Sequence, residues 1–235
     1  MIPLRDDIPS FRSPVVNYVL IAVNAAVFLG ELAMGPLLGK FIQAYGFVPG
    51  RFLYLWNEGG LAGLPDMVLP LLTAMFLHGG WLHIIMNMWI LYIFGDNVED
   101  FLGHGRYLAF YLACGVVGFL GQFMFFPQSP VPTIGASGAI AGVMGAYFYL
   151  YPRARVLTLL PIFFFFTILE VPAYFFLGFW FLMQFFSGTF SMAGRGAAVG
   201  GVAFWAHVAG FLAGALLLQV FAPVRTPNPF RRRWG

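Results

Sequence analysis

Six long runs of apolar residues constrain this chain more than any other feature of its sequence. The runs span roughly residues 15–36, 77–95, 106–126, 137–151, 157–186 and 201–222. Inside a lipid bilayer, the backbone N–H and C=O groups of a spanning segment must pair with each other, which favours helices. A run of about 20 apolar residues is long enough to cross the hydrocarbon layer. We therefore predict an all-α membrane protein with six transmembrane helices.

Composition supports lipid as the main solvent of this chain. Hydrophobic residues make up 60% of the sequence and charged residues only 9%, whereas soluble domains carry about 25% charged residues. The fifth run exceeds one simple span and contains Pro161 and Pro172, so we expect its first part to be a bent connection or an extra helical turn. For the long segment 37–76 we expect a loop on the membrane surface.

The distribution of charge predicts three regions and an orientation. The regions are a cytoplasmic N-terminal segment over residues 1–14, a membrane domain over 15–222 and a basic cytoplasmic tail over 223–235. With six spans, nine of the 12 Lys and Arg residues lie on the side of the termini. Because cytoplasmic loops are enriched in these residues, we predict that both termini are cytoplasmic, in a plasma (inner) membrane. No basic run resembles a nucleic-acid patch, so we expect no nucleic-acid partner.

Four polar residues within the apolar runs are candidates for chemistry, because polar groups are costly in a membrane without a purpose or a partner. They are His83, Asn87, Ser137 and His207. At ~1.5 Å per helical residue, His83, Ser137 and His207 lie ~20–24 Å above the cytoplasmic ends of their runs. The hydrocarbon layer is ~30 Å thick. Three separate helices are thus expected to place polar groups at one depth.

Ser137 stands in the sequence Gly135-Ala136-Ser137-Gly138, at the start of the fourth run. The N-terminus of a helix has unpaired N–H groups and the positive end of the helix dipole. Both would stabilise an oxyanion that forms beside the serine oxygen. A nucleophile and a simple N-cap serine both fit this position, so the motif by itself leaves the two open.

His207 favours the nucleophile, because a serine hydroxyl needs a base and histidine is the usual one. Small residues on both helices would let the two runs approach closely. The residues predicted to form this contact are Gly138, Gly142, Gly210 and Gly214. Ser137 and His207 could then come within hydrogen-bond distance. The alternative for His207 is a purely structural hydrogen bond between helices.

His83 and Asn87 are four residues apart and therefore share one face of their helix. Both can donate hydrogen bonds to a developing oxyanion, and one such donor is worth ~3–4 kcal/mol in the transition state. A structural hydrogen-bonded pair between helices is the alternative. His78, His83 and His207 could supply nitrogen ligands to a metal, but no Asp, Glu or Cys lies at their level, so we expect no metal and no cofactor.

Three motifs now stand in order along the chain: His83-x-x-x-Asn87, Gly135-x-Ser137-Gly138 and Ala206-His207-x-x-Gly210. With these motifs on the second, fourth and sixth runs, the sequence resembles the rhomboid family of intramembrane serine proteases. The resemblance covers about residues 70–222. It implies a six-helix rhomboid-like bundle.

The resemblance also implies roles for these residues. Ser137 would attack the scissile carbonyl, and His207 would act as general base and then as general acid, without an acidic third member. His83, Asn87 and the backbone N–H of Ser137 would form the oxyanion site. The family further implies that the fifth helix and the loop near 187–200 gate the access of substrate and water.

Two departures and one match qualify the resemblance. The Trp-Arg pair that some members carry in the first loop is missing here. Some members carry a tyrosine one turn after the nucleophile, stacked on the catalytic histidine, whereas this chain has Ala141. We therefore expect Trp205 or a residue of the second helix to orient His207. Glu99 matches an acidic position of the family that looks structural.

The expected function is that of a serine endopeptidase which cleaves transmembrane segments of single-span membrane proteins within the lipid bilayer. One alternative is a noncatalytic rhomboid-like protein that binds or escorts membrane proteins, although such proteins typically lack the serine or the histidine. A transporter or channel is a further alternative. It would usually line its pathway with charged residues, but Glu31 and Glu170 are the only plausible intramembrane acids here, and they are expected on different helices. The oligomeric state is not predicted.

Overall fold

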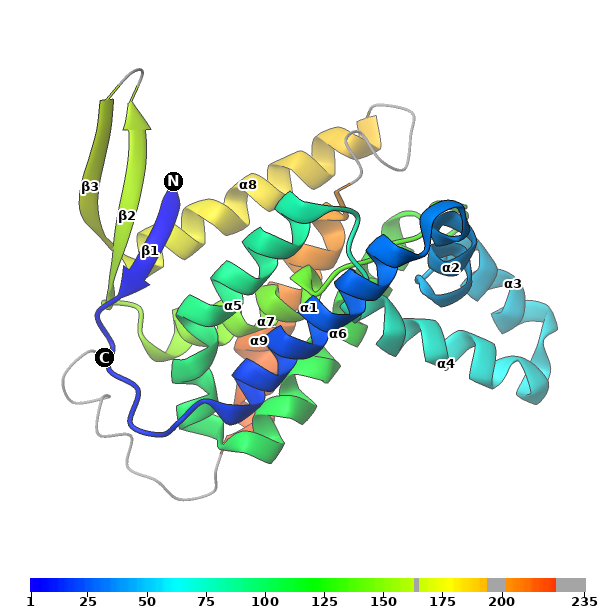
Figure 1. Cartoon of the computed structure of the whole chain (residues 1–235), viewed down its shortest axis with the longest axis horizontal. Helices are drawn as coiled ribbons and strands as arrows, with labels where there is room; N and C mark the ends of the chain where they lie inside the picture. Colours follow the sequence, from blue (N-terminus) through cyan, green and yellow to red (C-terminus); the bar gives the residue numbers. More distant parts are fainter. Residues whose placement is uncertain (163–164, 194–201, 223–235) are drawn as a thin grey trace.

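The computed structural model describes residues 1–162, 165–193 and 202–222, and most of them are helical (Figure 1). The predicted tail over 223–235 lies outside the described residues. A short helix, α7 (Ser137–Leu150), accompanies five long ones. The long helices are α1 (Val15–Ala33), α5 (Trp81–Leu102), α6 (His104–Phe125), α8 (Ala173–Ala193) and α9 (Phe204–Phe221). The expectation of a mostly helical protein is confirmed.

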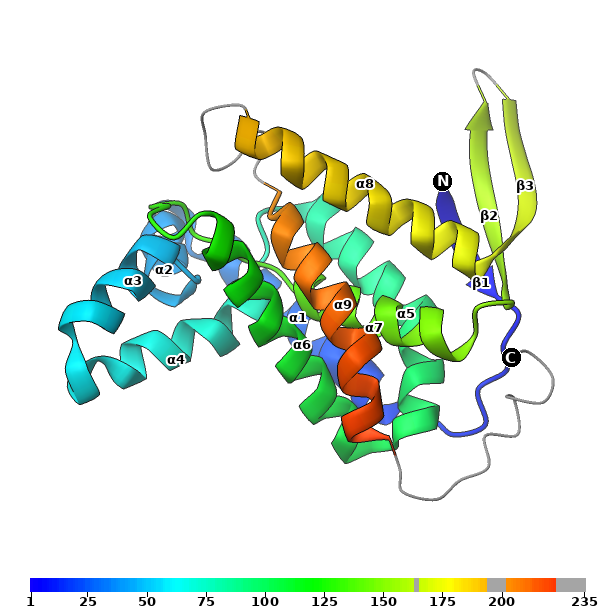
Figure 2. The same cartoon turned by 180° about the vertical axis from the view of Figure 1, so that it is seen from behind.

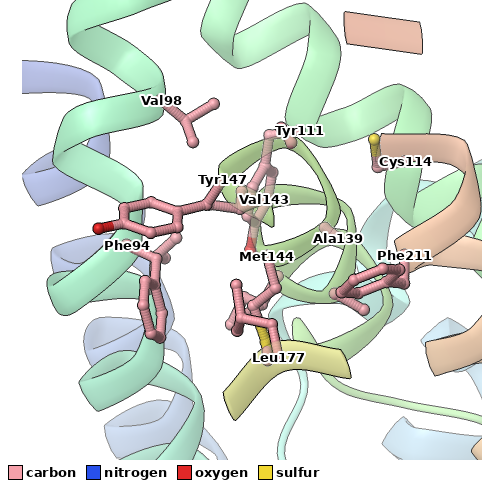
Figure 3. Close-up of a cluster of buried hydrophobic side chains, with 14 of the residues drawn as sticks. Phe94, Val98, Tyr111, Cys114, Ala139, Val143, Met144, Tyr147, Leu177 and Phe211 are labelled. Carbon is pink, nitrogen blue, oxygen red and sulfur yellow. The ribbon is translucent and has the colours of Figure 1, made fainter. Parts of the chain in front are cut away.

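The shortest of these helices, α7, forms the centre of the bundle. All its residues from Gly138 to Tyr147 are buried, and it packs against α5, α6 and α9 (Figure 2). Figure 3 shows side chains of five helices meeting in one apolar cluster, among them Phe94, Tyr111, Met144, Leu177 and Phe211. The start of α7 therefore lies within reach of several helices.

Helices α7 and α9 approach each other so closely that two glycines of α9 face backbone oxygens of α7. A Cβ at Gly210 would lie 2.1 Å from the oxygen of Gly138, and a Cβ at Gly214 would lie 1.9 Å from that of Gly142. Both positions therefore require glycine. Gly142 is confined by α6 as well, because its Cβ would lie 2.4 Å from Cβ of Cys114. Gly138 has more room, with the nearest atom at 3.6 Å.

The length and apolarity of the helices support fewer membrane spans than the six apolar runs predict. Among the described residues, α1, α6, α8 and α9 are long and apolar enough to cross a membrane. A fifth candidate joins α5 to the preceding segment Gly60–Phe76, which meets it at an angle of 84°. Helix α7 has only 14 residues. These criteria support four or five spans, so six is not confirmed.

The first part of the fifth run is not helical, and the all-α prediction was wrong there. It folds into an antiparallel hairpin of β2 (Arg155–Ile162) and β3 (Phe165–Pro172), which projects from the bundle beside the start of α8 (Figures 1 and 2). This stretch is rich in β-branched and aromatic residues, which favour strands. In a helix, Pro161 would remove a hydrogen bond and clash with the preceding turn.

A third strand, β1 (Ile2–Asp6), pairs antiparallel with β2. The N-terminal segment is also tied to the helices. The indole N–H of Trp89 on α5 donates to the carbonyl oxygen of Pro3 at 2.7 Å, and the hydroxyl of Tyr147 on α7 donates to the carboxylate of Asp6. This segment therefore belongs to the folded body, and its cytoplasmic location stays a prediction.

The segment between α1 and α5 is more regular than the predicted loop. It contains α2 (Leu38–Tyr45), α3 (Pro49–Glu58) and α4 (Leu64–Thr73), which lie at the end of the molecule opposite the sheet (Figure 1). The guanidinium of Arg51 donates to three carbonyl oxygens at the end of α2, at 2.6–3.2 Å. These bonds satisfy carbonyls that have no partner within the helix. A position on the membrane surface stays a prediction.

A buried carboxylate joins the start of α1 to α5. Glu99 accepts hydrogen bonds from the backbone N–H groups of Val16 at 2.9 Å and Asn17 at 2.7 Å. These N–H groups lie in the first turn of α1 and have no partner within the helix. The side-chain amide of Asn17 in turn donates to the carbonyl oxygen of Leu91 at 3.0 Å. Glu99 therefore caps α1.

Candidate active site

Ser137 is the first residue of α7, and a loop with a glycine at positive φ leads to it. Gly135 has a φ of +121°, a region that favours glycine, and its N–H donates to the carbonyl oxygen of Ala74 at 2.8 Å. A Cβ at Gly135 would lie 2.7 Å from the imidazole of His83. The loop thus brings the start of α7 and the imidazole of α5 together, with space for glycine alone between them.

Ser137 does not cap α7. A capping serine accepts a hydrogen bond from an N–H of the first helical turn, but the residue at the cap position is Ala136, which makes no such bond. The hydroxyl oxygen of Ser137 instead lies 2.8 Å from Nε2 of His207, which is 70 residues away in the chain. The geometry therefore gives no support to the N-cap alternative.

His207 lies in the first turn of α9 and is oriented by α8. Its Nδ1 lies 2.8 Å from Oε1 of Gln184, and its ring lies 5.8 Å from that of Trp180, centre to centre. The expectation that Trp205 orients His207 was wrong, because Trp205 stacks on Phe125 at 3.7 Å with an angle of 14° between the rings. No residue of α5 makes a hydrogen bond to His207 among those described.

Neither Gln184 nor Trp180 was predicted. The available signal was the amide itself, because Gln184 is the only amide side chain in the 21 residues of α8, which contain no charge. A polar side chain in such a helix is costly in a membrane unless it has a hydrogen-bond partner. Sequence spacing does not reveal which partner it has. The helix also extends to Ala193, so the first part of the predicted 187–200 loop is helical and the rest falls on residues outside those described.

His83 and Asn87 face the same region from α5. Nδ1 of His83 accepts a hydrogen bond from the N–H of Gly79 at 3.3 Å, so the proton of the neutral ring is on Nε2. Nε2 and Cε1 are the ring atoms nearest to a Cβ placed at Gly135, both at 2.7 Å. Nδ2 of Asn87 is buried and has no partner among the described residues. Two donors are therefore directed at the loop before Ser137.

A cavity of about 820 Å³ joins these groups. Its lining includes the side chains of His83, Asn87, Ser137 and His207, together with loop residues such as Val131. Such a volume is typical of a pocket for a ligand or a short peptide segment. The cavity therefore gives a substrate carbonyl room to meet the serine oxygen and the two donors at once.

His78, the third histidine of the region, makes contacts that stabilise the fold. The backbone N–H of His78 donates to the carboxylate of Glu31 at 3.2 and 3.3 Å. Its ring packs against that of His83, with 5.0 Å between the ring centres.

Across the described ranges, no group of three or more His, Cys, Asp or Glu residues is placed to hold a metal ion. Glu170 pairs with Arg155 at 2.7 Å, where both side chains are exposed.

Chemically, the arrangement combines a hydroxyl, a base and donors to an anion. The hydroxyl of Ser137 can pass its proton to Nε2 of His207, which makes the oxygen nucleophilic. The N–H groups of His83 and Asn87 can then stabilise negative charge on an attached oxygen. This set of groups suits acyl transfer to a serine.

Comparison with known proteins points the same way. The chain matches the family model described as the Rhomboid domain over residues 65–223. It is 36% identical to Rhomboid protease GluP of Bacillus subtilis over 138 residues, which are 58% of this chain and 25% of that protein. It is 28% identical to Rhomboid protein 1, mitochondrial, of Saccharomyces cerevisiae over 145 residues, 60% of this chain and 38% of the relative.

A plant relative extends the range of compartments. The chain is 31% identical over 124 residues to Rhomboid-like protein 11, chloroplastic, of Arabidopsis thaliana, covering 53% of this chain and 38% of that protein. The matched part spans less than half the length of each of these three relatives.

Proposed function

This chain belongs to the rhomboid family, whose domain model covers more than half of it, and we propose that it is an intramembrane serine endopeptidase using a Ser137–His207 dyad. Family membership and the apolar helices make it an integral membrane protein. The observation that carries the proposal is the 2.8 Å contact between the hydroxyl of Ser137 and Nε2 of His207.

In the proposed mechanism, Oγ of Ser137 attacks the scissile carbonyl carbon while Nε2 of His207 accepts the hydroxyl proton. The carbonyl oxygen becomes an oxyanion that accepts hydrogen bonds from Nε2–H of His83, Nδ2–H of Asn87 and the backbone N–H of Ser137. The imidazolium of His207 then gives its proton to the leaving amine, and an acyl-enzyme remains. Water, deprotonated by His207, hydrolyses the ester in the second half of the reaction.

The proposed substrates are single-span membrane proteins. A helical substrate hides its carbonyl groups in intrahelical hydrogen bonds, so it must unwind locally before Ser137 reaches one. Glycine and proline lower the cost of unwinding, and we propose that cleavage occurs near such residues at the outer end of the substrate helix. The cavity of about 820 Å³ is large enough for an unwound segment.

The proposed topology keeps the six spans of a rhomboid-like bundle. Residues 15–222 form the membrane domain, with α5 and the short central α7 counted as spans, and both termini are cytoplasmic. Relatives named as mitochondrial and chloroplastic show that the family occupies several membranes. For this chain we propose the plasma (inner) membrane, and the excess of arginines on the side of the termini supports the cytoplasmic orientation of both termini.

The test is covalent labelling of the detergent-solubilised protein by a fluorophosphonate probe. Wild type is expected to be labelled, and Ser137→Ala and His207→Ala are expected to drop to background, because both members of the dyad act as a unit. Ser191→Ala is the matched control, because the hydroxyl of Ser191 is bonded within α8 to the carbonyl oxygen of Gly188. Equal labelling of wild type and Ser137→Ala would contradict the nucleophile assignment.

Cleavage of a model single-span substrate then separates the protease from the noncatalytic binder. Wild type is expected to cleave it, whereas Ser137→Ala should bind it without cleavage. If the wild-type protein retains the substrate but cleaves none of it, the binding or escort function is supported instead.

A further inference from the structure

We propose that Gln184 is a positioning residue that holds His207 in the one neutral tautomer able to activate Ser137. This inference rests on the proposed function and adds a third member to the dyad. Two hydrogen bonds occupy the two nitrogens of the imidazole. Nε2 lies 2.8 Å from the hydroxyl of Ser137 and Nδ1 lies 2.8 Å from Oε1 of Gln184.

The roles of the two nitrogens are linked. A neutral imidazole carries one N–H and one lone pair, on different nitrogens. To take the proton of Ser137, Nε2 must present its lone pair, so the proton of His207 must be on Nδ1. A proton on Nδ1 needs an acceptor, and the carbonyl oxygen of the Gln184 amide is in place. With the amide oxygen of Gln184 facing Nδ1, as the structure has it, a hydrogen bond forms only in this tautomer, because an amide oxygen cannot donate.

Helix α8 is built to present Gln184 to α9. Trp180 lies one turn before Gln184 and contacts both His207 and Phe211, and Phe181 packs on Phe211 at 5.0 Å. These aromatic contacts place one face of α8 against α9. A lone amide in an uncharged membrane helix is costly without a partner. The bond to Nδ1 supplies that partner, and it explains why an amide stands among aromatic residues.

The position of Gln184 also compensates for a feature of α7. Ala141, one turn after Ser137, has no ring to stack on His207. Orientation of the base therefore comes from α8, which lies outside the contact between α7 and α9 (Figure 2). The alignment of the dyad then depends on α8 being docked against α9.

The first arm of the test measures turnover. Gln184→Met keeps the length and approximate volume of the side chain but removes the strong acceptor. We expect kcat to fall about ten- to a hundredfold, because a buried N–H loses its partner and the other tautomer becomes populated, while KM stays within about twofold. Gln184→Glu keeps an acceptor at the same place and is expected to recover most of the lost turnover.

The second arm reads the tautomer directly. The chain has only four histidines, so ¹⁵N NMR of histidine-labelled protein, with His207→Ala for assignment, distinguishes a protonated from an unprotonated ring nitrogen at His207. We expect a proton on Nδ1 in wild type and a mixture with protonated Nε2 in Gln184→Met. The control is Gln219→Met, the same substitution at an exposed position of α9 about three turns after His207. This variant should change neither the ¹⁵N signals of His207 nor kcat.

The outcomes separate the inference from the proposed function. If the fluorophosphonate probe does not label the wild-type protein, the protease proposal fails, and the NMR arm still reports the tautomer. If wild type is labelled and Gln184→Met matches it in turnover and in its His207 signals, the positioning role is refuted. Equal losses in Gln184→Met and Gln184→Glu, with an unchanged tautomer, would also refute it, because they would indicate a purely structural role.

Discussion

At the residue scale, the site is defined by which polar atoms have partners and which do not. The hydroxyl of Ser137 and both nitrogens of His207 are engaged. Nδ2 of Asn87, in contrast, is buried without a partner in the described part of the chain. An unpaired buried donor costs about 1–3 kcal/mol. A donor kept at such a cost, beside a cavity, is what an oxyanion site requires before its substrate arrives.

Asn87→Ala is therefore expected to lower kcat by about 10²-fold without lowering the unfolding temperature, because Nδ2 makes no hydrogen bond to the described residues of the folded protein that the substitution would remove. The structural alternative, a hydrogen-bonded pair between helices, gives the opposite result for stability. Asn97→Ala is the matched control on the same helix. Its amide donates to the carbonyl oxygen of Ile8 at 3.1 Å, so its loss should lower the unfolding temperature. A parallel fall in both variants would favour the structural alternative for Asn87.

At the element scale, the contact between α7 and α9 places the two members of the proposed dyad on adjacent first turns. It depends on the absence of side chains at particular positions. A Cβ at Gly214 would lie 1.9 Å from a backbone oxygen, which cannot move aside as a flexible side chain can. Small residues serve the same purpose in membrane helix pairs generally.

Gly214→Ala is expected to destabilise the fold by more than about 2 kcal/mol, which is about 5 °C or more in the unfolding temperature of a chain of this size. Gly30→Ala in α1 has nothing within 4 Å of the new Cβ and should be neutral or slightly stabilising. Gly138→Ala should fall between the two. Thermal unfolding in one detergent checks the order, and equal shifts for Gly214→Ala and Gly30→Ala would contradict the close contact.

At the scale of the whole molecule, the N-terminal segment closes the end of the bundle that carries the sheet. β1 pairs with β2, and Asp6 bonds to Tyr147 of the central helix. Burial is the main cause that raises the pKa of the Asp6 carboxyl to about 7. The Tyr147 hydrogen bond opposes this rise, and the neighbouring carboxylates of Asp96 and Asp7 add to it.

This pKa predicts how stability depends on pH. Between about pH 4 and pH 7 the folded protein binds the Asp6 proton more tightly than the unfolded chain does, so the contribution of Asp6 to stability is full below pH 4. It is lost as the pH rises through 7. Unfolding temperatures measured from pH 5 to pH 8 should fall with pH in wild type and fall less in Asp6→Asn. The control Asp66→Asn, on α4 at the far end of the molecule (Figure 1), should keep the wild-type dependence.

Much of the site could be predicted because its signals are local. Apolar runs indicate helices, a serine after a glycine-containing turn indicates a helix start, and glycines one turn apart indicate a close helix contact. The hairpin of β2 and β3 was not predicted, although its two strands are neighbours in the sequence. An apolar run fits a membrane helix as well as a strand, and pairing between strands decided the outcome.

The sequence by itself determined the lipid environment, the family motifs and the choice of Ser137 and His207 as the proposed reactive pair. Only the tertiary structure decided that Gln184 meets Nδ1 of His207, that β1 joins the hairpin, and that Gly214 is tightly confined while Gly138 is not. The physical reason is that apolarity and helix starts are properties of neighbouring residues. Partners across helices depend instead on how whole elements pack, which no spacing along the chain encodes.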